Sequence, residues 1–415
     1  MRRILALWVL VCASVSAQQI SIPTEVSGRP FSIVKTWIIG GEGDWDHLTA
    51  DPKAGQLFIA HGPVVQVVDM ETGTLEGQVS GLREARSIAV DETGQFGYIS
   101  DAKADEVVVF DRRSLQVTAR IPVSASPQML VYDMLDKLLF AIAYTPPERA
   151  TRRVASRDAN GHLQVTYVSD PTPDRSAAQS VASSIEVIDT ETGTKVGRLL
   201  FSGHLDSAQF DGQGGLFISV VDRTYVLRID THTTASQLRS QGGGDTATLD
   251  WRDSKLSDKA RLAWTAPNHP DIYRFGSSCA EPKALAVDGH LGRLFVACTS
   301  MKLTVWNIRH GELVASLPLN ATPDSLAYDA DRDLLFVASA SGSLTVIDRH
   351  VTDSYAVIQE LPTRQRARTL AVNQATGEIF LVCNLLGVDL SKSGGIGNLK
   401  VVPVPGSFQV LVVKD

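Results

Sequence analysis

Short apolar runs separated by turn residues recur along the chain about every forty residues. Each unit opens with an apolar segment that ends in Asp or Asn, and a second run with a central aromatic residue follows. A third run, rich in Val and Ile, ends in another acidic residue or Asn. Such runs, β-branched or aromatic and bounded by turn residues, predict strands. The residues that end the first segments are Asp51, Asp91, Asp133, Asp211, Asp288, Asp329 and Asn373.

The rest of each unit agrees with an antiparallel sheet. Residues 69–73 and 189–193, which begin at the acidic ends of two third runs, have the composition of turns. Each has an Asp that can cap backbone N–H groups and a Gly that can supply positive φ. Residues 117–121 are an example of a fourth segment. The sequence therefore predicts an all-β fold, a seven-bladed β-propeller of four-stranded antiparallel blades. The aromatic residues of the second runs are Phe58, Tyr98, Phe140, Phe217, Phe295, Phe336 and Phe380.

A ring must join its last sheet to its first, and the chain offers a strand for this purpose. The seventh unit ends one strand short, whereas residues 32–39 form a spare strand ahead of the first unit. We therefore expect one propeller over residues 31–415, closed by an N-terminal strand in the last blade.

Three insertions interrupt the repeat, at about 145–184, 241–276 and 384–405. The first and last fall between the second and third strands of blades three and seven. A possible extra strand occupies 162–168 in the first. The middle insertion separates blades four and five. If residues 260–264 are the outer strand of blade four, residues 268–271 lie on the face of the ring where the inner strands begin. The register of this fourth unit stays open.

One repeat supports a more specific comparison. The segment Gly97-Tyr98-Ile99-Ser100-Asp101, continued through residues 107–111 to 121–123, resembles the YVTN-type propeller repeat. The chain after residue 30 is similar to the exported YncE-like family. The resemblance implies the fold but no single function, because related propellers include haem, copper and amine-oxidising enzymes, lactonases and binding scaffolds.

The N-terminus has the pattern of an export signal. Met1-Arg2-Arg3 precedes the apolar run 4–11, and Val15-Ser16-Ala17 is a small-x-small cleavage site. We expect residues 1–17 to be a signal peptide and 18–30 a linker, with a periplasmic or secreted product. The run is too short for a membrane-spanning helix, and no second stretch is long enough.

The charge balance argues against capture of polyanions. In 415 residues, 39 Lys and Arg stand against 46 Asp and Glu, a net charge of −7. Binding to nucleic acid is therefore not expected. It would depend on the cluster Arg149, Arg152, Arg153 and Arg157 alone. We expect a monomer.

Signal cleavage would leave Cys279, Cys298 and Cys383 in an oxidising compartment. Cys298 and Cys383 occupy equivalent strands with a whole blade between them, so they are too far apart to pair. Cys279 and Cys298 belong to one blade. A disulfide between them is possible if the chain bends near Pro282, and without a bend they stay apart.

Polar residues stand five positions before the marker Asp or Asn in every unit, at the start of each inner strand, and His204 stands seven positions before Asp211 in the next ring out. We expect them to form a charged collar at one mouth of the channel, the collar face, where loops of all blades converge. Solvated residues that pair among themselves are the alternative interpretation. The predicted ligand-binding residues are Asp46, Arg86, Gln128, His204, Asp206, Lys283, Asp324 and Arg368.

No sequence motif identifies chemistry. No His-x-His, His-Glu-x-x-His or Cys-x-x-Cys spacing occurs, so we predict no metal ligands, no catalytic residue and no particular cofactor. The favoured function is a non-catalytic binding or scaffold propeller that recognises a small polar ligand or a protein segment. The alternative is a cofactor- or metal-dependent oxidoreductase or lactonase-like hydrolase at the same mouth. Its candidate residues are Asp46, His204, Asp206 and Asp324.

Overall fold

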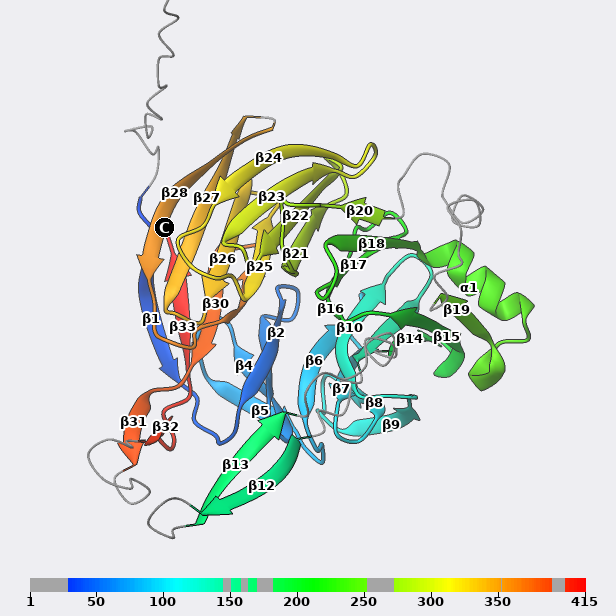
Figure 1. Cartoon of the computed structure of the whole chain (residues 1–415), viewed down its shortest axis with the longest axis horizontal. Coiled ribbons are helices and arrows are strands. Elements are labelled where there is room, and N and C mark those ends of the chain that lie inside the picture. The colour runs from blue at the N-terminus through cyan, green and yellow to red at the C-terminus, as the bar shows by residue number, and fades with distance from the viewer. Residues whose placement is uncertain are drawn as a thin grey trace, which may run out of the picture.

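Seven antiparallel blades form a ring in the structure, a computed structural model (Figure 1). It describes residues 29–144, 151–157, 163–169, 182–251, 272–351, 353–389 and 400–415. The predicted signal peptide 1–17 and most of the linker lie outside the described residues, as do Arg149, 260–264 and 268–271.

The strands follow the predicted repeat from the channel outward. Blade 1 contains β2 (Trp45–Asp51), β3 (Gln56–His61), β4 (Val64–Asp69) and β5 (Leu75–Val79). Blade 2 contains β6 (Ala85–Val90), β7 (Phe96–Asp101), β8 (Glu106–Asp111) and β9 (Val117–Pro122). Blade 3 contains β10 (Pro127–Asp133), β11 (Leu138–Tyr144), β14 (Ala182–Asp189) and β15 (Thr194–Ser202).

The second half of the ring repeats this order. Blade 4 contains β16 (Leu205–Phe210), β17 (Gly215–Val220), β18 (Tyr225–Asp230) and β20 (Ile272–Arg274). Blade 5 contains β21 (Pro282–Asp288), β22 (Arg293–Cys298), β23 (Lys302–Asn307) and β24 (Glu312–Pro318). Blade 6 contains β25 (Ser325–Asp329), β26 (Leu334–Ser339), β27 (Ser343–Val351) and β28 (Ser354–Pro362).

Blade 7 joins the two ends of the described chain, as predicted. It contains β29 (Thr369–Asn373), β30 (Glu378–Cys383), β33 (Gln409–Lys414) and, outermost, β1 (Ser32–Ile38). β1 pairs antiparallel with β33, and the two lie side by side in Figure 1. At the channel β2 contacts both β6 and β29, so the ring of inner strands is complete.

The closing strand is also held from blade 6 and blade 1. The Gln359 side chain accepts a hydrogen bond from the Phe31 N–H (2.8 Å) and donates one to the Phe31 carbonyl (2.7 Å). Trp37 packs on Phe380 and lies so close to Gly73 that a Cβ there would fall 2.2 Å from the indole. The glycine of the 69–73 turn therefore provides the space for the closing strand.

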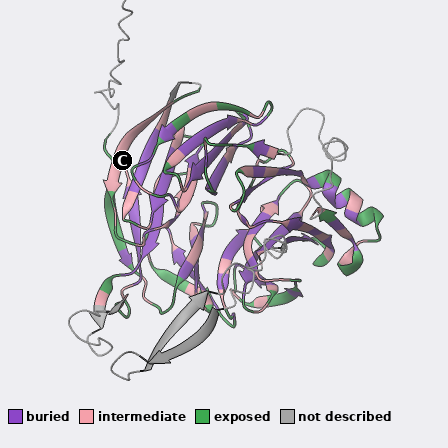
Figure 2. Ribbon diagram, in the orientation of Figure 1, coloured by how far each residue is buried: buried purple, intermediate pink, exposed green. Residues whose placement is uncertain are grey.

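The hydrophobic core lies between neighbouring blades, because each sheet packs one face against the blade before it and the other against the blade after it. The buried residues of the blades are coloured purple in Figure 2. One cluster, for example, joins blades 1 and 2 through Phe58 and Phe110. The seven aromatic residues of the predicted second strands are all at most 3% exposed. The periodic aromatic position is thus a packing position.

The marker residues act as turn caps. Asp51 Oδ1 accepts hydrogen bonds from the N–H groups of Lys53 and Ala54, and Asn373 Oδ1 binds those of Ala375 and Thr376 in the same way. The side chains of the other markers, Asp91, Asp133, Asp211, Asp288 and Asp329, also accept from the backbone of the turn that follows each of them. The repeated acid therefore fixes the turn between the first two strands of every blade.

The insertions contain structure that the sequence analysis only partly anticipated. In the first, β12 (Thr151–Arg157) pairs with β13 (Leu163–Ser169), close to the extra strand expected at 162–168. In the last, β31 (Leu386–Asp389) pairs with β32 (Lys400–Pro403). Both hairpins project from the ring in Figure 1.

The structure supplies the register of the fourth unit, which the sequence left open. Its outer strand is β20, inside the range assigned to the 241–276 insertion, because 272–274 pairs with β18. Helix α1 (Thr231–Ser240) and the 3-10 helix η2 (Gly244–Thr246) were not predicted. β19 (Thr248–Trp251) then adds to blade 3 as a fifth strand, parallel to β15. Asp230, the acidic residue that ends the third run of this unit, is the N-cap of α1 and accepts from the Thr233 N–H.

The structure contains a disulfide between Cys279 and Cys298, whose Cα atoms are 5.4 Å apart. The bend required near Pro282 is present. Glu281 has a φ of 49°, and a bulge at Lys283 places Pro282 opposite Cys298. Cys383 is a buried free cysteine, and burial raises the pKa of its thiol.

Thiol counting tests this cysteine assignment. A mature chain without Cys12 should show one free thiol when denatured without reductant and three after reduction. Replacing both Cys279 and Cys298 by Ala should lower the free energy of unfolding by about 3 kcal/mol, since the closed loop spans 19 residues. Three free thiols without reduction would show that the bridge does not form.

Candidate functional site

The inner strands carry a bulge where the collar was predicted. In blades 1 to 5 the pairing register shifts by one residue in the interval that holds the fifth residue before the marker. An extra residue in one strand bends the chain and redirects side chains. The collar residues of these blades are therefore set apart from the regular strand pattern.

The collar is organised as ion pairs between neighbouring blades. Arg86 of blade 2 donates to Asp46 of blade 1 at 2.9 Å, and Lys283 of blade 5 donates to Asp206 of blade 4 at 2.6 Å. Burial works against the charged form of Arg86, but its contacts with Asp46 and Glu84 raise its pKa overall. All four paired side chains are 21% to 36% exposed, so each pair contributes about 0–1 kcal/mol.

The other collar residues make separate contacts. Gln128 Nε2 donates to Ser126 Oγ at 2.7 Å, and Asp324 accepts from the Ala340 N–H of its own blade at 2.7 Å. Arg368 donates to the Trp45 carbonyl across the boundary between blades 7 and 1 (2.9 Å). The eight predicted residues thus lie around the ring in local contacts instead of converging on one point.

His204 belongs to an aromatic stack beside the Asp206–Lys283 pair. Its ring lies on Tyr144, with centroids 3.7 Å apart and planes 13° from parallel. Burial lowers the pKa of His204, although the charges of Asp206 and Asp222 favour protonation; Lys283 opposes it. The ring is therefore held in its neutral form more firmly than a free histidine.

A second cluster closes the boundary between blades 7 and 1. Arg366 donates to Asp44 of blade 1 and, at 3.2 Å, to Asn384 Oδ1 of blade 7. Its guanidinium lies 4.7 Å from the centre of the Trp45 ring, a cation–π contact. Arg366 has a φ of 67°, an uncommon conformation for a non-glycine residue. The arginine is thus fixed by contacts from two blades.

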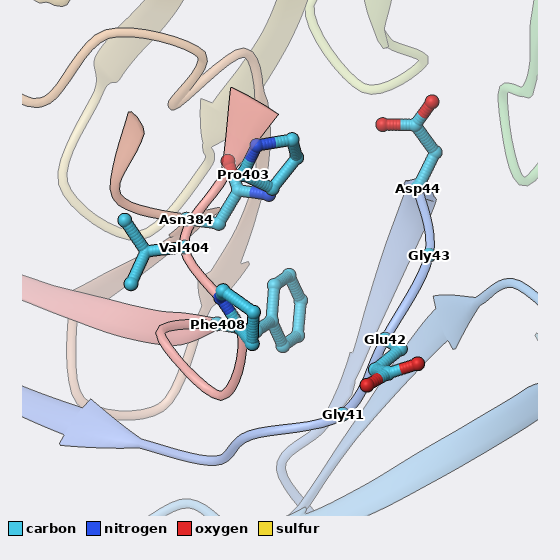
Figure 3. A pocket seen from close by; sticks show the side chains of 9 residues that line it. Gly41, Glu42, Gly43, Asp44, Asn384, Pro403, Val404 and Phe408 are labelled. Carbon is cyan, nitrogen blue, oxygen red and sulfur yellow. The ribbon is translucent and has the colours of Figure 1, made fainter. Parts of the chain in front are cut away.

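A pocket of about 420 Å³ opens beside this cluster on the collar face (Figure 3). One wall is the segment that enters β2, with two glycines and two carboxylates, and the other belongs to blade 7. Val404 and the 2% exposed Phe408 make the second wall apolar. The lining residues are Gly41, Glu42, Gly43, Asp44, Asn384, Pro403, Val404, Pro405 and Phe408.

Close packing supports the floor of the pocket. Phe408 lies against His61, with ring centroids 4.0 Å apart, and against Trp45 at 5.3 Å. A Cβ at Gly41, where φ is 104°, would fall 2.9 Å from His61 Cε1. Only glycine fits this position without a shift of the histidine, so the backbone itself forms the wall.

The predicted collar and the pocket overlap only in part. Asp44 and Arg366 stand seven positions before their markers, in the same ring as His204, but of that ring only His204 was selected from the sequence. Phe408 and Asn384 were missed. Ring closure was the feature of the sequence that could have pointed to them. It places residues 32–39 beside 408–413, and the 384–405 insertion also belongs to blade 7.

Within the described residues no three His, Cys, Asp or Glu side chains gather as a metal site. No helix in the described part of the chain has the length and apolar character needed to span a membrane.

The pH dependence of stability tests the environment of His204. Because the folded pKa is lowered, the unfolded chain takes up the proton first. Stability should therefore be full above about pH 6.5 and fall as the pH drops toward the folded pKa. His204→Phe, which keeps the stack on Tyr144, should lose less stability than wild type between about pH 7 and 5 in urea titrations. Parallel profiles for the two proteins would contradict the assignment.

Comparisons with known proteins agree on the fold. No family model and no curated protein matches the chain. Among solved structures, the WD40 repeats of RRP9 match with a TM-score of 0.59 and 10% identity, over 91% of this chain and 96% of that one. A chain from the mitotic checkpoint complex matches at 0.57 and 13%, over 95% and 98%. Hydrazine synthase from Kuenenia stuttgartiensis matches at 0.55 and 16%, over 87% and 95%. At these identities, the likeness establishes a seven-bladed β-propeller with WD40-repeat structural neighbours.

Proposed function

We propose that this chain is an exported, monomeric binding propeller of the YVTN-repeat, YncE-like kind, located in the periplasm or secreted. It recognises a small polar ligand or a protein segment on the collar face and carries out no reaction itself. The repeat sequence around Gly97–Asp101 and the N-terminal pattern of residues 1–17 support the family and the export. Propellers often serve as binding scaffolds, which agrees with this role.

The observation that carries the proposal is the pocket between blades 7 and 1. Its volume of about 420 Å³ lies within the range of about 300–1,000 Å³ typical of small-molecule sites. It combines an apolar wall with a few polar groups, which is the composition such sites share. The collar pairs Asp46–Arg86 and Asp206–Lys283 line the same face and keep it polar.

The contacts of the collar favour the pocket as the point of binding. Asp46, Arg86, Asp206 and Lys283 already satisfy one another, so a ligand there would have to separate ion pairs. The pocket offers an open volume and Glu42, an exposed carboxylate. We therefore assign the principal binding role to the pocket. The eight predicted residues have a supporting role around the channel.

A pocket-filling variant tests the proposal. Val404 is 39% exposed and lines the pocket, so Val404→Trp should fill it without disturbing a buried core. Ligand-observed NMR with a library of small polar metabolites should find compounds that bind the wild type and not Val404→Trp.

Leu313→Trp on β24 is the matched control, since Leu313 is 43% exposed and lies on an outer strand of blade 5. It should bind like the wild type. If no compound distinguishes Val404→Trp from the wild type, the pocket is not the binding site.

A further inference from the structure

The polar groups of the pocket form a charge pattern that selects a ligand class. Two carboxylates, Glu42 and Asp44, stand on the segment before β2. The guanidinium of Arg366 contacts lining residues on both walls, Asp44 on one and Asn384 on the other. The pocket lining thus carries two carboxylates and an apolar wall, and the positive group contacts two of the lining residues.

Asn384 offers a hydrogen-bond donor on the wall of the pocket. The residue is only 6% exposed, and its Oδ1 accepts from Arg366. Its Nδ2 makes no hydrogen bond within the described residues. Among the described residues this nitrogen is not one of the fully buried polar atoms that lack a partner, so it is accessible at the pocket wall, where a bound ligand can supply an acceptor. The Arg366 guanidinium and the Asn384 amide together suit a carboxylate.

Asp44 accepts a hydrogen bond from Arg366, and a ligand carboxylate can displace it. Its side chain is 76% exposed, so its pair with Arg366 is worth about 0–1 kcal/mol. The preceding Gly43 has a φ of 110°, as glycine allows, and Gly41 is equally free of a side chain. Arg366 would keep its contacts with Trp45 and Asn384 when Asp44 moves away.

Resting on the proposed binding function, we infer that the pocket binds a free apolar α-amino acid. The ligand carboxylate replaces Asp44 on Arg366 and accepts from Asn384. The ligand ammonium group donates to Glu42 and to the released Asp44. The apolar side chain lies against Val404 and Phe408. A zwitterion pairs its carboxylate with Arg366 and its ammonium group with the two carboxylates. A simple anion leaves both carboxylates without a partner, and a simple cation makes no use of Arg366 or of the Asn384 amide.

Leucine and its blocked analogues test the inference by isothermal titration with the full chain. Leucine should bind saturably. N-acetylleucine lacks the ammonium group and resembles a peptide C-terminus; leucine amide lacks the carboxylate and resembles an N-terminus. Each should bind roughly ten- to a hundred-fold more weakly, the range for a lost charge-assisted hydrogen bond. Glycine, without an apolar side chain, should also bind more weakly.

Variants connect the binding to named groups. Glu42→Gln changes an exposed side chain that carries little risk for folding, and it should weaken leucine at least about ten-fold while leaving N-acetylleucine unchanged. Arg366→Gln should weaken leucine and N-acetylleucine alike. Arg364→Gln is the control, because Arg364 is exposed and does not line the pocket.

The outcomes separate this inference from the function on which it rests. No saturable leucine binding, or equal affinity for leucine and either blocked analogue, would overturn the amino-acid assignment. If compounds from the metabolite library still distinguish the wild type from Val404→Trp, the proposed binding function stands without it. If leucine binds and Val404→Trp does not weaken it, the assignment to this pocket is wrong.

Discussion

The pairing of β1 with β33 is the interaction on which the rest of the molecule depends, because it turns a row of sheets into a ring. Each blade buries its apolar faces against its neighbours, and the terminal blades have neighbours only if the ring closes. Six β1 residues from Ser32 to Ile38 pair with β33, and the side chain of Gln359 fixes the backbone just before them. Trp37 extends the closure to the Gly73 turn of blade 1.

Closure also explains why the pocket lies between blades 7 and 1. The chain leaves β1 at the outer edge of blade 7 and must reach the channel to begin β2. The segment that makes this crossing is rich in glycine and carries Glu42 and Asp44 to the collar face. Opposite it, the β31–β32 hairpin interrupts blade 7 and brings Val404 and Pro405 to the second wall. At this boundary a crossing segment meets an insertion, and the two leave a space between them.

The repeat pattern was sufficient to predict most of the fold. The capping role of residues such as Asp51 and the burial of Phe58 are local requirements that return in every blade, so both appear as a period in the sequence. Helix α1 was missed for a related reason. An Asp that accepts backbone N–H groups caps a turn and a helix N-terminus alike, so the acidic end of the third run did not distinguish Asp230 from the turn residues of other units. β20 has three residues and no marker, so pairing with β18 was not visible in the sequence.

The candidate site was less predictable than the fold. The polar positions at Asp46 and Arg86 were found from spacing, but their pairing depends on the reach of side chains across two blades. Arg366 and Asp44 are far apart in the sequence and meet only through closure. Phe408 looked like an ordinary strand residue, although its ring supports the pocket against His61.

Removal of the closing strand tests the account most directly. A chain that begins at Gly40 lacks β1, so the β33 edge and the Phe380 face against Trp37 become exposed. Backbone hydrogen exchange of β30 and β33, measured with the melting temperature and the molar mass in solution, reports on closure. The account predicts faster exchange in both strands, a lower melting temperature and self-association through the open edge. A monomer with unchanged exchange and melting would contradict the closure and, with it, the origin proposed for the pocket.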